Sequence, residues 1–158
     1  MLDTILVENI ELCDLLHYTP DTLHLIHIKK GFKNSVRELA NQVALAARRV
    51  INDRKSNYGY IEEIGKKLRA GKTSGSSLKQ QMAAQTLPTK NLVELFQQKR
   101  DREIIFCLAF VDEAATPRIL KDDLEKFDSN IAKYSLIALK REITGMGFGF
   151  KVIQLPKK

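Results

Sequence analysis

The chain has 158 residues, long enough for one domain with a proper core, and its 44% hydrophobic and 28% charged residues exclude disorder on a large scale. The net charge of +7 favours a polyanionic partner such as nucleic acid, although a basic balance alone identifies none. Acidic residues near the N-terminus and the lack of a membrane-spanning apolar run argue against a signal peptide and a membrane segment, so we expect a cytoplasmic protein with no membrane association.

The first predicted elements are strands. Thr4 to Val7 is a short β-branched and aliphatic run, either an edge strand or the start of the next arm. Two longer apolar runs, Ile10 to Leu16 and Leu23 to Lys29, flank a Pro-Asp turn. The segment from Ile10 to Gly31 is therefore predicted to be a β-hairpin.

A long amphipathic helix is predicted after the hairpin. Gly31 to Asn34 is expected to form a turn, with Ser35 as the N-cap residue. Apolar residues then recur at helical spacing, so one face should pack on a sheet. These residues are Val36, Leu39, Val43, Ala46, Ala47, Val50 and Ile51.

The middle third, residues 57–101, has a different character. Helical spacing predicts a helix from Tyr58 to Ala70, and we also expect a short helix over Leu78 to Ala84 and another over Asn91 to Gln98. The composition of Gly71 to Ser77 predicts a flexible connection. We interpret this part as a helical insertion or subdomain within a single α/β domain.

The last third returns to alternating strands and helices. The unbroken apolar run from Ile104 to Val111 is typical of a central strand that is buried on both faces. After a loop we predict a short helix over Ile119 to Phe127, a longer one over Asn130 to Thr144 and a final strand over Phe148 to Leu155. The pattern predicts an α/β domain whose mixed sheet is flanked by helices.

Other chemically active residues have simple interpretations. Cys13 and Cys107 lie in apolar runs without CxxC spacing, which predicts reduced core residues and no zinc site. Asp112 and Glu113 follow the central strand, where α/β proteins place ligands, but acids that end strands commonly cap the following turn. We interpret this acidic pair as structural.

The hairpin carries polar residues where burial is expected. Asp14 lies within the first arm, and His27 and Lys29 share a face of the second because side chains alternate along a strand. A buried charge needs a partner or a metal. Phosphodiester hydrolysis uses a divalent cation and a positive charge near the phosphate, for which carboxylates and a lysine are suited.

This pattern resembles the PD-(D/E)xK nuclease superfamily, in which an acid on one hairpin strand faces an acid-x-lysine on the next. The resemblance implies a restriction-endonuclease-like core, metal binding at the positions of Asp14 and His27, and a lysine, here Lys29, that positions or activates water. It also implies a role for Gln42 on the following helix and Mg²⁺ or Mn²⁺ as cofactor. His27 stands where a carboxylate is usual, and Glu11 or Glu8 is a candidate to replace it as ligand.

A second resemblance is to the carboxyl-terminal part of a sporadically distributed bacterial family of uncharacterised function, whose members are longer. It rests on the segments ELCDLL and LIHIKKG, on Gln42 and on the ending Gly145-Met146-Gly147-Phe148. It implies that the chain is a fragment, with an upstream part that could supply another acid or act as a partner.

The sequence supports two functional hypotheses. One is a metal-dependent nuclease, acting on DNA first and RNA second. The other is a catalytically inactive module of the same fold that binds nucleic acid or a protein partner. A homo-oligomer is compatible with both hypotheses. The simpler alternative makes Asp14 and Lys29 a cross-strand ion pair. Both hypotheses use a basic surface, with phosphate contacts expected from Lys30, Lys33, Arg37, Arg48, Arg49 and Arg54.

Overall fold

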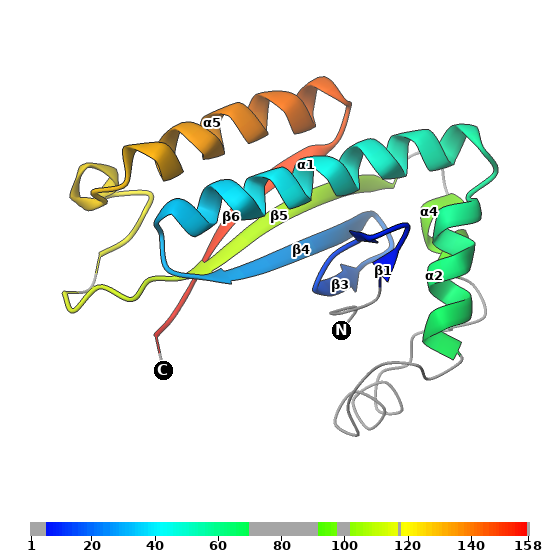
Figure 1. Cartoon of the computed structure of the whole chain (residues 1–158), viewed down its shortest axis with the longest axis horizontal. Coiled ribbons are helices and arrows are strands. Elements are labelled where there is room, and N and C mark those ends of the chain that lie inside the picture. The colour runs from blue at the N-terminus through cyan, green and yellow to red at the C-terminus, as the bar shows by residue number, and fades with distance from the viewer. Residues whose placement is uncertain (1–5, 70–91, 98–101, 117, 158) are drawn as a thin grey trace.

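A computed structural model of the chain describes residues 6–69, 92–97, 102–116 and 118–157. Its centre is a four-stranded sheet with the order β3-β4-β5-β6 (Figure 1). The strands are β3 (Leu15–Tyr18), β4 (Thr22–Lys30), β5 (Glu103–Val111) and β6 (Gly149–Leu155). β3 is antiparallel to β4, whereas β4, β5 and β6 are parallel to one another. The predicted α/β class with a mixed sheet is confirmed.

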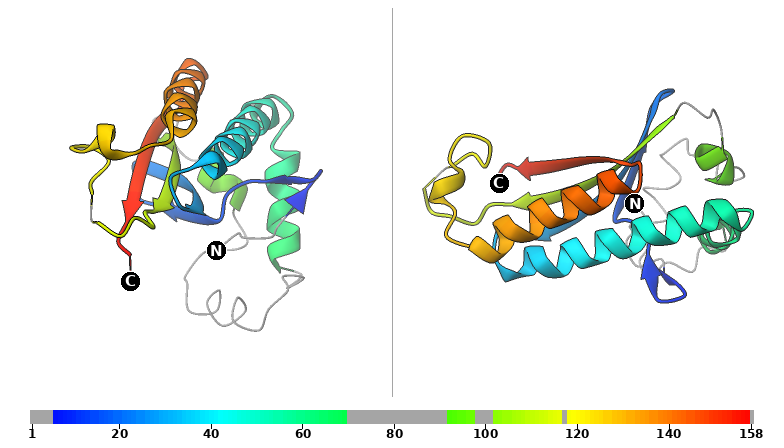
Figure 2. Two further views of the ribbon diagram at one scale, coloured as in Figure 1. Left: turned by 60° about the vertical axis from the view of Figure 1, so that its left-hand side comes forward. Right: turned by 90° about the horizontal axis from the view of Figure 1, so that it is seen from above.

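The two long helices, α1 (Asn34–Lys55) and α5 (Asn130–Gly145), pack side by side on one face of the sheet (Figure 2). α1 connects β4 to β5 by way of the middle segment, and α5 connects β5 to β6. Parallel crossovers of the same hand that step in one direction across a sheet place their helices on one face. Within the described residues, no helix is long and apolar enough to cross a membrane.

β5 is the central strand that its apolar run predicts. Every residue from Ile104 to Phe110 is buried, and β4 and β6 flank the strand on its two edges. Phe106, Leu108 and Phe110 belong to the main core with the apolar stripe of α1, while Cys107 points to the opposite face of the sheet. Both cysteines are buried and unbridged, as expected.

The first arm of the hairpin is shorter than predicted. Residues before Asp14 instead form a separate two-stranded sheet of β1 (Leu6–Val7) and β2 (Ile10–Glu11). Glu8 and Asn9 connect these strands with positive φ angles of 55° and 60°. Two consecutive residues of positive φ make the tight turn that fits the twist of a two-stranded hairpin. The prediction of one continuous arm from Ile10 to Leu16 is therefore wrong.

Two local predictions at helix starts are also wrong. Lys33, not Ser35, holds the N-cap position of α1, without a side-chain cap. The Ser35 hydroxyl instead donates to the carbonyl of Lys30 at 3.4 Å.

Of the predicted helix from Ile119 to Phe127, only the 3₁₀ turn η2 (Leu124–Lys126) is helical in the structure. There the Asp123 carboxylate accepts from the N–H of Ile119, a side-chain bond that competes with a regular helix.

The middle segment contains the predicted helices α2 (Gly59–Arg69) and α4 (Leu92–Gln97). The side chain of Asp53, at the end of α1, is 1% exposed and accepts hydrogen bonds from the N–H groups of Tyr60 and Ile61 at 2.8 and 3.0 Å. This carboxylate therefore fixes the start of α2 on the end of α1. The predicted connection 71–77 and helix 78–84 lie outside the described residues, and the insertion stays a prediction.

Candidate functional site

The β3–β4 hairpin has the predicted turn. Leu15 lies opposite Ile26 and Tyr18 opposite Leu23, and the Thr19 N–H donates to the Thr22 carbonyl at 2.9 Å. The two threonine hydroxyls, 2.8 Å apart, also bond to each other. The turn therefore fixes the register of the two strands that carry the candidate residues.

Asp14 lies just before β3 and is tied to β4 by both its backbone and its side chain. Its N–H donates to the Ile26 carbonyl at 3.0 Å, and its Oδ2 accepts from the N–H of Ile28 at 2.6 Å. The carboxylate thus accepts a hydrogen bond from a part of β4 that does not pair with β3, since that pairing stops at Ile26. Because Ile28 separates His27 from Lys29, this bond brings Asp14 beside the His-x-Lys segment.

His27 is on the helix-covered face of β4, with Leu23 and Leu25, and its side chain is only 1% exposed. Among the described residues, neither ring nitrogen has a hydrogen-bond partner. Burial lowers the pKa of His27 to about 4, and the nearby backbone of Leu12 opposes this shift by a smaller amount. The imidazole is therefore neutral at pH 7 and shielded from water.

Lys29 follows on the same strand face as His27, as the alternation predicts, and it is half-buried. Glu11 and Asp14 both raise the pKa of the buried Cys13 thiol, after the larger effect of burial, so both carboxylates lie near that thiol. Gln42, in contrast, is exposed on α1. Across the described residues, no three His, Cys, Asp or Glu side chains are grouped so that they could hold a metal ion.

Half of the predicted phosphate-contact residues are engaged within the chain. Arg48 forms an ion pair with Glu142 of α5 at 2.7 Å. Arg49 makes two hydrogen bonds of 2.9 Å with the Glu8 carboxylate. The Arg54 guanidinium lies 5.4 Å from the centre of the Phe148 ring. These three arginines stabilise contacts between elements.

The other three, Lys30, Lys33 and Arg37, are exposed where β4 passes into α1, and their side chains form no ion pair within the described residues. Lys30 and Lys33 line a cleft of about 630 Å³ between the ends of β4 and β5 and the start of α5. Its other lining residues are Phe32, Asn34, Ser35, Glu113, Arg118, Asp128 and Ser129. The cleft is at the carboxyl-terminal end of the parallel strands, where open α/β sheets place ligands.

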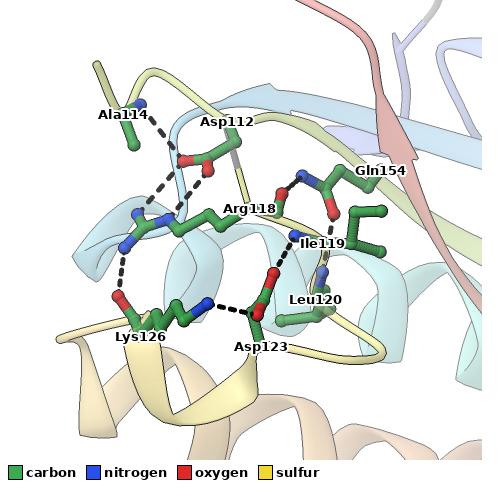
Figure 3. A network of polar contacts seen from close by, with 8 residues as sticks. All are labelled: Asp112, Ala114, Arg118, Ile119, Leu120, Asp123, Lys126 and Gln154. Atoms are coloured by element: carbon green, nitrogen blue, oxygen red, sulfur yellow. Dashed lines mark hydrogen bonds and ion pairs between the residues drawn. The ribbon is translucent and has the colours of Figure 1, made fainter. Parts of the chain in front are cut away.

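The walls of this cleft depend on a polar network around Arg118 (Figure 3). Its guanidinium donates to both oxygens of Asp112, at 2.8 and 3.1 Å, and to the carbonyl of Lys126. Hydrogen bonds from Arg118 lower the pKa of Asp112. The guanidinium also lies 4.0 Å from the centre of the Phe127 ring.

Gln154 of β6 completes the network. Its side chain accepts from the N–H of Leu120 at 2.8 Å and donates to the carbonyl of Arg118 at 2.7 Å (Figure 3). The segment between β5 and α5 is therefore held to the last strand. The structural interpretation of Asp112 agrees with this geometry, but Arg118 and Gln154 were not predicted from the sequence. The position of Asp112 directly after a buried strand was the available signal.

Comparisons of the chain with models of known protein families, with curated proteins and with solved structures gave no match.

Proposed function

We propose that this chain binds nucleic acid, DNA before RNA, at the end of the sheet where β4 passes into α1, and that it does so without cutting phosphodiester bonds by itself. The single observation that carries the proposal is the group of Lys30, Lys33 and Arg37, exposed and without ion pairs among the described residues. Charges of this kind are available for phosphate groups, whereas paired arginines are not.

The burial of His27 supports binding over catalysis. In the nuclease superfamily that the hairpin resembles, this position holds a carboxylate that binds metal, whereas a neutral and shielded imidazole adds no negative charge for Mg²⁺. In this proposal the hairpin keeps a nuclease-like arrangement, with a restriction-endonuclease-like core, while its role is to position the basic end of the sheet.

The test is a fluorescence anisotropy titration with labelled duplex DNA over a range of salt concentrations. The double variant Lys33→Ala/Arg37→Ala should weaken binding and reduce the slope of log affinity against log salt by about 2, because two phosphate contacts are lost. The matched control, Lys55→Ala/Arg141→Ala, removes the same charges at exposed sites elsewhere. Lys55 lies about 33 Å from Lys33 along α1, from the rise of 1.5 Å per residue.

Equal losses in the two double variants would contradict the proposed site, because they would show that only the net charge matters. Absence of salt-sensitive binding by the unchanged chain would contradict nucleic-acid binding altogether. Single-stranded RNA, tested in parallel, measures the preference for DNA.

A second candidate function is Mg²⁺- or Mn²⁺-dependent hydrolysis, and the hydrogen bond from Ile28 to Asp14 favours it because that bond brings a carboxylate to the strand segment that carries Lys29. Plasmid cleavage would be followed with each metal for the chain and for Asp14→Asn and Lys29→Gln. Asparagine keeps an acceptor for the Ile28 N–H, so loss of cleavage in Asp14→Asn would reflect chemistry and not unfolding. Cleavage that survives both substitutions would exclude this site.

A further inference from the structure

The outer edge of β6 is open. β6 pairs with β5 on one side, and no described strand pairs with its other side. An unpaired edge offers a row of backbone N–H and C=O groups that fit an extended chain. In both views of Figure 2, β6 lies at the margin of the sheet, and α5 is the nearer of the two long helices.

The side chains along this edge alternate in character. Val152 is paired in register with core residue Leu108, so it is on the helix-covered face, and it is 36% exposed. Lys151 is in register with Cys107, so it is exposed on the opposite face. A strand added beside β6 would therefore place alternate side chains next to an apolar and a cationic neighbour.

The side of α5 that faces away from α1 also carries both apolar and cationic side chains. Glu142 bonds Arg48 of α1 at 2.7 Å, which marks the side of α5 that faces α1. Lys133, Ile137 and Lys140 have the helical spacing i, i+4 and i+7 on the opposite side of α5. Ile137 is 52% exposed and Lys140 is also exposed.

The cationic side chains near the outer edge of β6 determine which kind of extended segment can pair with it. β6 contains no acidic residue, and the single acid of α5, Glu142, is turned toward α1. The carboxylate of Glu103, on β5, lies beside Gly149 at the start of β6. A second copy of the chain would bring Lys151 and the α5 lysines near their own counterparts, which is unfavourable. An extended acidic segment would instead gain both the backbone bonds and the ion pairs.

We propose that the outer edge of β6 is a docking site for an extended, acidic segment of a partner protein, which adds a fifth strand to the sheet. Its apolar side chains pack beside Val152 and Ile137, and its carboxylates face Lys151 and the lysines of α5. Strand addition to an open edge is an established mode of peptide recognition. This site is separate from the basic group at Lys30, Lys33 and Arg37.

The probe is a fluorescent peptide of alternating glutamate and valine, as long as the seven residues of β6, with acetylated and amidated ends. We expect salt-sensitive binding in an anisotropy titration, and a loss of at least about tenfold in affinity for Lys151→Glu and for Val152→Asp. The matched controls, Lys55→Glu and Leu45→Asp, change exposed residues of α1 in the same way and should leave the affinity within about twofold.

In an added strand, the N–H groups of alternate residues point toward β6 and those of the other residues point to solvent. A peptide with N-methyl groups on alternate residues, made in both registers, keeps the charges but loses the donors to β6 in only one register. One of these two peptides should bind at least about tenfold more weakly than the unmodified peptide, whereas the other should bind within about twofold of it. The proposal is overturned if the two N-methylated registers bind with equal affinity, if Lys55→Glu weakens binding as much as Lys151→Glu, or if no binding occurs at about 1 mM peptide. Circular dichroism of each variant verifies that it is folded.

Discussion

Replacing His27 by leucine tests the central feature of the hairpin, a buried imidazole without a hydrogen-bond partner among the described residues. Leucine is apolar and similar in size, so it suits a position beside Leu23 and Leu25. At pH 7 the substitution should raise the free energy of unfolding by about 1 to 3 kcal/mol, because it removes unsatisfied polar atoms from the core.

The effect should grow as the pH falls. His27 has a pKa of about 4 in the folded chain, against an ordinary value of 6.5. Between these values the unfolded chain binds a proton that the folded chain does not, so the stability of the unchanged protein decreases as the pH falls. The full difference is about 3 kcal/mol and is reached below pH 4. The leucine variant lacks this loss.

Urea unfolding at several pH values between 7 and 4 measures the difference between the two proteins. The control is His17→Leu, which replaces an exposed imidazole of the same hairpin and should show no comparable pH-dependent gain. A constant difference between the unchanged protein and His27→Leu across this range would refute the reasoning. So would an NMR titration that placed the pKa of His27 near 6.5.

Three further substitutions test other contacts. Asp53→Ala should lower the free energy of unfolding, measured by urea denaturation, by about 2 to 3 kcal/mol, because two buried N–H groups at the start of α2 lose their acceptor. An unchanged free energy of unfolding would contradict this role of Asp53. Gly149→Ala should cost about 1 to 3 kcal/mol by thermal unfolding, since the added Cβ would lie 2.9 Å from Cγ1 of Ile105 and 2.5 Å from Oε1 of Glu103. Full stability would mean that both neighbours move freely. Arg118→Ala should raise the pKa of Asp112 in an NMR titration, because Asp112 loses its main hydrogen-bond donor. The same substitution should speed hydrogen exchange in the segment between β5 and α5. Unchanged exchange would show that the network does not hold that segment.

The sequence predicts those parts of the fold that depend on local patterns. The apolar run of β5 and the periodicity of α1 each identify an element without knowledge of its neighbours. The predicted N-cap at Ser35 is wrong because α1 begins one residue earlier, at Asn34, without a side-chain cap that a sequence pattern could reveal. The network of Arg118 and Gln154 joins residues 36 positions apart, and no local pattern contains that information.

The same limit applies to the candidate site. Alternation along β4 correctly placed His27 and Lys29 on one face, but it could not tell that α1 and α5 both cover that face. Burial of His27 follows from the crossover geometry, which depends on the whole chain. The roles assigned to Asp14, His27 and Lys29 by resemblance remain predictions.

The central pair of strands, β4 and β5, joins segments that are far apart in the chain, since β4 ends at Lys30 and β5 begins at Glu103. The entropy of closing a connection grows only with the logarithm of its length, about 0.6 kcal/mol for each doubling. Extra length in this connection therefore costs little stability, while its closure slows folding. Over evolution, insertions and deletions should accumulate between α1 and β5 more readily than anywhere in the sheet.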